Sequence, residues 1–156
     1  MDDLERLSII EDIRNLMARY AHYADDKRWS DLAALFTADG TFSPLRPDGS
    51  VLTYMTGRKN IAEMIGARVG DAQPIHHLFS YEIDVTSPTS ACATWAMEDL
   101  VSRPDTVEVP AHDVHNELDF KTLHGYGHYH GSYVKVDGSW LIAELRQTRL
   151  RLDFTY

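Results

Sequence analysis

The spacing of hydrophobic residues predicts helices in the first half of the chain. From Leu4 to Ala24, apolar side chains recur every three or four positions, the pattern of an amphipathic helix that buries one face. Ser30 can cap a second, shorter helix, and the pair Asp39-Gly40 is expected to end it in a turn. A third helix is expected around residues 61–65, closed by Gly70.

The second half of the chain has the pattern of a sheet. Four segments read as long strands: His77 to Val85, Ala91 to Val101, Phe120 to Val136 and Trp140 to Leu152. The polar segment Pro104 to Asn116 is expected to be a loop between two of them. We therefore predict an α+β fold in which three N-terminal helices pack on a strongly curved, mixed, mainly antiparallel β-sheet. A pocket is expected at the open end of such a sheet.

Composition narrows the class of protein. The chain has 156 residues and is 44% hydrophobic, which suits a single domain spanning residues 1–156. Its net charge is −9 and no Lys or Arg stripe is present, so nucleic acid is not an expected partner. The N-terminus MDDLERL is acidic where a signal peptide would be basic, and no apolar run reaches membrane-spanning length. We expect a cytoplasmic protein without a membrane partner.

Two aspartates occupy unfavourable positions. Asp25 lies near the end of the first expected helix, where the helix dipole disfavours a carboxylate. Asp99 continues the apolar face of a strand that includes Trp95 and Met97, and a buried carboxylate there needs a partner. The alternatives are that Asp25 is solvated and that a twist turns Asp99 to solvent.

Histidines provide candidate bases. His76 and His77 open a strand, and since neighbouring strand residues face opposite sides, at most one of them can point inward. A histidine beside a carboxylate can exchange protons near neutral pH. His128 and His130 share a face with His124, but no acidic residue lies at typical metal-ligand spacing, so we expect neither a metal nor another cofactor.

The order of elements and several segments resemble the SnoaL-like branch of the NTF2-like superfamily. These segments are RYAHYADDKRWSDLAALFTADGTF, GRKNIAEMI, TWAMEDL and GSYVKVDGSWLIAEL. The superfamily fold is a cone with an apolar pocket, and its members include scytalone dehydratase, hexachlorocyclohexane dehydrochlorinase and bile acid 7α-dehydratase. The resemblance implies a cofactor-independent lyase or isomerase that acts on an apolar, ring-containing molecule such as a steroid or polyketide.

The same resemblance implies roles for individual residues. His77 would be the base, Asp25 or Asp99 would hold its ring, and Tyr20 would donate a hydrogen bond to the substrate. Arg149 matches a pocket arginine.

Three further side chains are expected to contact the substrate: His76, Trp95 and Tyr129. The choice between His76 and His77 stays open, because the histidine of the bile acid dehydratase aligns near Phe79 instead.

Two further expectations concern assembly and the alternative function. Long strands rich in Tyr and His predict a homodimer or homotrimer formed through the sheet. The alternative to an enzyme is a non-catalytic ligand-binding protein or a scaffold like the β-subunit of ring-hydroxylating dioxygenases, since one fold serves several functions. A histidine–carboxylate pair that lines an open cavity would favour the enzyme. A cone whose interior is filled by side chains would favour the scaffold.

Overall fold

Three helices and six strands make up the part of the chain that the computed structural model describes, residues 1–105 and 120–156. In chain order the elements are α1 (Asp3–Asp25), α2 (Trp29–Ala34), β1 (Phe36–Pro44), β2 (Met55–Thr56), α3 (Arg58–Val69), β3 (Gln73–Ser87), β4 (Ser90–Ser102), β5 (Thr122–Val136) and β6 (Ser139–Thr155). The expected loop Pro104 to Asn116 lies almost entirely outside the described residues. None of the described helices is long and apolar enough to cross a membrane.

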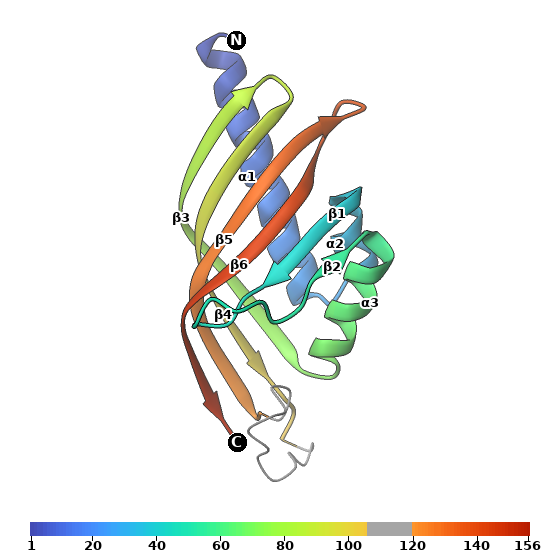
Figure 1. The fold of residues 1–156 in the computed structure, drawn as a ribbon, viewed down its shortest axis with the longest axis vertical. Coiled ribbons are helices and arrows are strands. Elements are labelled where there is room, and N and C mark those ends of the chain that lie inside the picture. The colour runs from blue at the N-terminus through green and yellow to red at the C-terminus, as the bar shows by residue number, and fades with distance from the viewer. Residues whose placement is uncertain (106–119) are drawn as a thin grey trace.

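The strands form one mixed sheet in the order β2-β1-β6-β5-β4-β3. β1 runs parallel to β6, and every other neighbouring pair is antiparallel. The long strands curve around α1, while α2 and α3 cover the end of the sheet near β1 and β2 (Figure 1). This arrangement confirms the predicted α+β fold of helices on a curved, mainly antiparallel sheet.

Helix α1 contributes one buried face to the hydrophobic core. Its buried residues follow the helical repeat: Ile9, Ile13, Leu16, Met17, Tyr20, Ala21 and Ala24. They pack on β3 and β6, and each large apolar side chain buried in this way contributes about 1.5–3 kcal/mol. The Asp2 carboxylate accepts a hydrogen bond from the backbone N–H of Glu5 and so caps the helix start. As a result, one face of a single helix covers the concave side of the sheet.

The predicted end of the second helix is wrong. Helix α2 ends at Ala34, and strand β1 continues through Asp39-Gly40, where a turn was expected. The strand forms because β6 pairs with it, and tertiary pairing outweighs the local turn preference. Gly40 permits this pairing, since a Cβ atom there would lie 3.0 Å from Phe36 Cβ and 3.1 Å from the carbonyl oxygen of Ile142.

Irregularities in β6 decide which of its side chains face the helices. Simple alternation along the strand expected from Trp140 to Leu152 predicts that Leu141, Ala143 and Leu145 share one face with Arg149. Instead, the next buried residue after Ile142 is Leu145, three positions later, because the pairing of β6 with β5 shifts register between them. Arg149 therefore faces inward, as expected, but it does so because of this bulge and not because the strand alternates without interruption.

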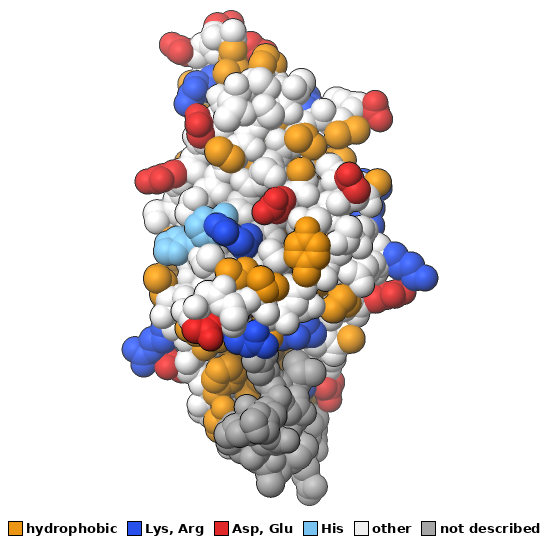
Figure 2. Space-filling model, in the orientation of Figure 1, with side chains coloured by type: hydrophobic (Ala, Val, Ile, Leu, Met, Phe, Trp, Pro, Cys, Tyr) orange, Lys and Arg blue, Asp and Glu red, His pale blue; other side chains and the backbone are white. Residues whose placement is uncertain are grey.

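The outer face of the sheet carries a group of histidines. Figure 2 shows histidine side chains beside Lys or Arg over the middle of β5 and β6. The rings of His128 and His130 lie 6.1 Å apart, and His130 Nε2 is 2.9 Å from the Thr148 hydroxyl. Burial, together with the charges of Arg146 and His128, lowers the pKa of His130.

Candidate active site

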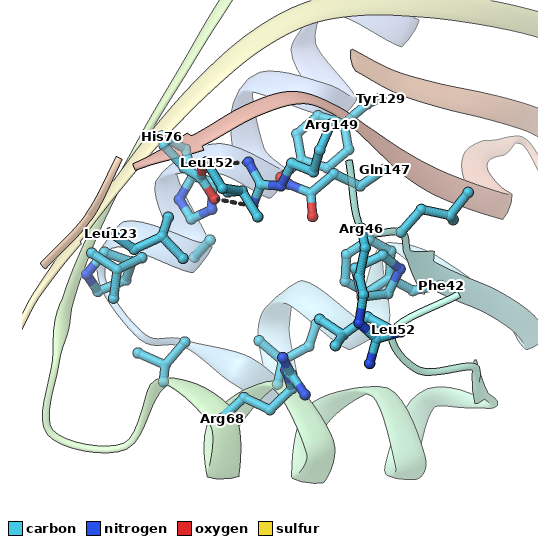
Figure 3. A pocket seen from close by; sticks show the side chains of 18 of the residues that line it. Phe42, Arg46, Leu52, Arg68, His76, Leu123, Tyr129, Gln147, Arg149 and Leu152 are labelled. Carbon is cyan, nitrogen blue, oxygen red and sulfur yellow. Dashed lines mark hydrogen bonds and ion pairs between the residues drawn. The ribbon is translucent and has the colours of Figure 1, made fainter. Parts of the chain in front are cut away.

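A cavity of about 390 Å³ opens between the concave side of the sheet and the helices. It falls within the range of roughly 300–1,000 Å³ that is typical of small-molecule sites. Its wall is mainly apolar, with contributions from α1, α3, several strands and the segment 45–52 (Figure 3). The polar or charged side chains among the lining residues are Tyr20, Arg46, Arg68, His76, Asp99, Tyr129, Gln147 and Arg149.

His76 and Asp25 form a hydrogen-bonded pair beside this cavity. His76 Nδ1 lies 2.8 Å from Asp25 Oδ1, and the backbone N–H of His76 donates to the same oxygen, also at 2.8 Å. Because the ionised carboxylate can only accept, Nδ1 carries the proton in the neutral imidazole, and Nε2 is left with a lone pair. Only 13% of the His76 side chain is exposed. Asp25 therefore fixes both the position and the tautomer of a histidine that lines the cavity.

His77, the residue first favoured as the base, lies on the other side of the strand. Its side chain is 53% exposed, it does not line the cavity, and its Nδ1 is 3.0 Å from Glu98 Oε1. His124 Nε2 contacts the other oxygen of Glu98, also at 3.0 Å. Hydrogen bonds with His77, which has the larger effect, and with His124 lower the pKa of Glu98. Strand alternation thus directs His76 inward and His77 outward.

Asp99 lies on the buried face of β4, as the strand pattern predicted, and Arg149 is its partner. Arg149 Nη1 donates to Asp99 Oδ1 at 2.6 Å, and Nη2 donates to Oδ2 at 2.9 Å. Both side chains are less than 10% exposed. Burial by itself would lower the pKa of Arg149, but the carboxylate of Asp99 outweighs it, and the pKa is raised. Asp99 is opposite His76 in the sheet, yet its oxygens bind Arg149, so Asp25 is the carboxylate that holds the histidine.

Two tyrosines and a glutamine form the next part of the wall. The Tyr20 and Tyr129 side chains share a hydrogen bond, and their rings meet edge to face at 5.6 Å. Gln147 Nε2 donates to the Tyr129 hydroxyl at 3.3 Å. Burial raises the pKa of both tyrosines, and the negative charge of Asp99 adds to the effect. Both phenols are therefore neutral at physiological pH and can donate a hydrogen bond.

Most of the sequence-predicted residues come together at the cavity, and two do not. Tyr20, His76, Asp99, Tyr129 and Arg149 line it, and Asp25 contacts His76 from behind.

The two exceptions are His77, on the outer face, and Trp95. Trp95 is buried in the core, where its Nε1 donates to the Tyr133 hydroxyl at 3.0 Å, and it does not line the cavity. The expectation that Trp95 contacts substrate is therefore not supported by its position.

Three of the polar or charged lining residues did not emerge from the sequence. Gln147 lies two positions before Arg149 on the same strand, so strand alternation could have identified it. Arg46 lies in the turn-like segment RPDGS, and Arg68 lies on the third helix, and neither has a local signal that points to a cavity. Tertiary folding alone brings Arg46 and Arg68 to the cavity.

The arrangement combines a proton acceptor with several hydrogen-bond donors on an apolar wall. His76 Nε2 can accept a proton, and the hydroxyl groups of Tyr20 and Tyr129 and the guanidinium of Arg149 are suited to an oxygen that gains negative charge. Among residues 1–105 and 120–156, no group of three or more His, Cys, Asp or Glu side chains is arranged to hold a metal ion. Acid–base chemistry on an apolar molecule is the reaction type that this wall favours.

Most of this chain is similar to known proteins. The model of the SnoaL-like domain matches residues 5–146. A probable cyclase from Gibberella zeae is 28% identical over 144 residues, which cover 88% of this chain and 89% of that protein.

Solved structures share the fold. A candidate scytalone dehydratase from Novosphingobium aromaticivorans has a TM-score of 0.77 at 24% identity, covering 97% of this chain and 91% of that one. A type 2 hexachlorocyclohexane dehydrochlorinase has a TM-score of 0.78 at 14% identity, covering 99% of this chain and 94% of that one.

Proposed function

The chain belongs to the SnoaL-like family, and we propose that it is a cofactor-independent lyase or isomerase acting on a ring-containing small molecule. The observation that carries this proposal is the His76–Asp25 pair, which presents an oriented imidazole to a mainly apolar cavity. The similar proteins support the class of reaction, since their names denote dehydration, removal of hydrogen chloride and cyclisation.

In the proposed reaction, His76 Nε2 removes a proton from a carbon beside a carbonyl group of the substrate. Asp25 accepts the Nδ1–H hydrogen bond throughout and stabilises the imidazolium that forms, because its negative charge is 2.8 Å away. Asp25 touches His76 and not the substrate, so its role is that of a positioning residue. An oriented base of this kind contributes roughly 10²- to 10⁴-fold to the rate.

The electron pair released from the carbon moves onto the carbonyl oxygen. Tyr20 would donate a hydrogen bond to this oxygen, helped by Tyr129, whose own oxygen accepts from Gln147. In an elimination, the electron pair returns and expels the leaving group, and in a dehydration the proton on His76 goes to the departing oxygen as water forms. In an isomerisation, His76 instead returns the proton to another carbon.

The same observations bear on the alternative of a non-catalytic scaffold. A scaffold of this fold has no need of an oriented histidine on the wall of its cone. The cavity is open, His76 lies on its wall, and Asp25 is at hydrogen-bond distance from His76. Both features favour an enzyme.

Proton exchange tests the proposal without knowledge of the natural substrate. Cyclic ketones such as 1-tetralone would be incubated with the protein in deuterium oxide, and NMR would follow deuterium uptake at the carbon beside the carbonyl. We expect the wild type to accelerate uptake and His76→Gln to lower the acceleration by roughly 10²- to 10⁴-fold.

The neighbouring variant His77→Gln is the matched control, since it removes an imidazole on the outer face of the same strand. It should exchange at the wild-type rate. Equal rates for His76→Gln and the wild type, or a wild type no faster than buffer across the ketone panel, would exclude His76 as the base.

A further inference from the structure

Gln147 is a buried polar side chain on the wall of the cavity. Only 5% of the residue is exposed, and it reaches the cavity from β6. Its Nε2 donates to the Tyr129 hydroxyl at 3.3 Å and to Met97 Sδ at 3.9 Å. Its Oε1, in contrast, accepts no hydrogen bond from any residue in the ranges 1–105 and 120–156. The amide oxygen of Gln147 is therefore an acceptor that the described part of the chain leaves unused.

The contacts of the amide nitrogen fix the direction of this oxygen. A thioether sulfur can only accept a hydrogen bond, so Met97 Sδ suits Nε2 and would not suit Oε1. With Nε2 turned toward Met97 and Tyr129, the oxygen is turned the opposite way. Figure 3 shows the amide oxygen of Gln147 pointing into the cavity. A bound molecule can therefore reach it.

This acceptor becomes costly when a ligand fills the cavity. In the free protein, water can bind to Oε1, because the oxygen faces the cavity. An apolar ligand displaces that water, and a buried acceptor without a donor loses free energy comparable to a lost hydrogen bond. Arg149 lies two positions further along the strand, but it directs both of its Nη atoms at Asp99. The ligand itself is therefore the source from which Oε1 can obtain a donor.

Gln147 and His76 lie on different strands of the wall. β5 and β4 separate β6 from β3, and neighbouring strands are about 4.8 Å apart. Figure 3 shows the side chain of Arg149 between the two residues. A group of the substrate that contacts Gln147 is thus remote from the carbon that gives its proton to His76.

Building on the function proposed above, we propose that the ring of the substrate carries a hydroxyl group that donates a hydrogen bond to Gln147 Oε1. The hydroxyl lies away from the carbon that loses its proton. A molecule of the same shape without a donor leaves the amide oxygen unpaired, and sites of this kind discriminate against such molecules. Gln147 therefore determines specificity for a hydroxylated ring and takes no part in the proton transfer.

2-Naphthol and 2-methylnaphthalene test this inference, because hydroxyl and methyl groups are similar in size and only the hydroxyl can donate. Each would be titrated into the wild type and Gln147→Met, with binding followed by ligand-observed NMR. Comparing the ratio of the two affinities between the proteins cancels the difference in hydrophobicity between the probes. We expect the ratio of naphthol to methylnaphthalene affinity to be about three- to tenfold lower in Gln147→Met, the effect of one net hydrogen bond. 2-Methylnaphthalene should bind this variant at least as tightly as the wild type, which shows that the cavity is intact.

Two further variants show which atom is responsible. Gln147→Glu keeps an oxygen acceptor and loses the amide nitrogen, so it should retain at least the wild-type ratio. Thr148→Val is the matched control at the next position of β6, where the hydroxyl contacts His130 on the outer face, and it should also keep the ratio. A ratio that falls in Gln147→Glu as it does in Gln147→Met would overturn the inference, because the effect would then belong to the bond from Nε2 to Tyr129.

The inference is also overturned if the ratio is the same in Gln147→Met and the wild type, or if 2-naphthol does not bind the wild type. A crystal structure of the wild type with 2-naphthol decides the question if Gln147→Met does not fold. We expect the naphthol oxygen about 2.5–3.0 Å from Gln147 Oε1, and a hydroxyl bound elsewhere on the wall rejects the proposal. These measurements involve no turnover. A failed proton-exchange test with an intact naphthol result would reject the proposed reaction and retain the hydroxyl site.

Discussion

Asp25 shows how one residue can violate a local preference for the sake of a site. A carboxylate at a helix C-terminus costs roughly 0.3–1 kcal/mol through the helix dipole. Here the side chain of Asp25 accepts hydrogen bonds from the backbone N–H and the ring of His76, and its carbonyl oxygen accepts one from Gln73. These contacts join the end of α1 to the start of β3 and offset the unfavourable position. The unfavourable position of Asp25 is visible in the sequence, but its partner His76 is identified only by the fold.

Tyr20→Phe separates a catalytic from a structural role for this hydroxyl. If Tyr20 stabilises the developing oxyanion, its removal should lower kcat by about 10²- to 10³-fold. The melting temperature should change little, because Tyr129 keeps its hydrogen bond from Gln147 and the lost bond is worth only about 1 kcal/mol. Kinetics of deuterium exchange and thermal unfolding measure the two effects. A large fall in melting temperature with unchanged exchange would show that the hydroxyl is structural.

The raised pKa of Tyr20 and Tyr129 predicts how stability depends on alkaline pH. The unfolded chain releases these protons near pH 10, about the ordinary value for tyrosine, whereas the folded protein retains them. The folded state then binds more protons, so the stability present below about pH 10 is lost as the pH rises further.

Denaturant unfolding on both sides of this pH should show a steeper loss in the wild type than in Tyr20→Phe/Tyr129→Phe. Titration of tyrosinate absorbance should also show two fewer late-titrating phenols in the double variant. Identical slopes for the two proteins would mean that these hydroxyls ionise normally in the fold.

At the scale of elements, strand β5 makes room for the site. Its inward positions are all glycine or tyrosine: Gly125, Gly127, Tyr129, Gly131 and Tyr133. Gly125 lies between Asp99 on β4 and the end of β6, and a Cβ atom there would lie 2.5 Å from Asp99 Oδ1. The Arg149–Asp99 pair therefore crosses β5 only because this position lacks a side chain.

Gly125→Ala should displace the Arg149–Asp99 pair. The added methyl group would force the buried ion pair apart or shift the strand, and overpacking of this kind costs about 1–3 kcal/mol. Chemical denaturation gives the change in stability, and a crystal structure or the Arg149 side-chain NMR signal reports the pair. Ser132→Ala, on the outer face of the same strand, should change neither. An unaltered ion pair in Gly125→Ala would show that the sheet can absorb the methyl group.

At the scale of the whole molecule, the outer face of the sheet is the surface that the helices leave uncovered. The predicted homodimer or homotrimer would form there. Light scattering coupled to gel filtration should give a mass of two or three chains, and His128→Glu, in the middle of this face, should reduce it to one. The rate of deuterium exchange of 1-tetralone in the same variant serves as the control for folding. A monomeric wild type at tens of micromolar, a usual concentration for stable assemblies, would rule the expectation out.

The sequence by itself determined the elements and the class of fold, because these depend on local periodicity. The helical repeat located α1, and period-two alternation located the four long strands and the buried face that carries Asp99. The same local reasoning failed at Asp39-Gly40, where pairing with β6 turned an expected turn into a strand.

The tertiary structure alone decided which residues meet. Strand alternation predicts that at most one of His76 and His77 points inward. Which of the two does so depends on the side of β3 that faces α1. The partner of Asp99 depended on a bulge in β6, and the approach of Arg46 and Arg68 to the cavity depended on how a loop and a helix close its end. Contacts between residues far apart in sequence leave no periodic trace in the chain, so they emerge only when the sheet and helices pack together.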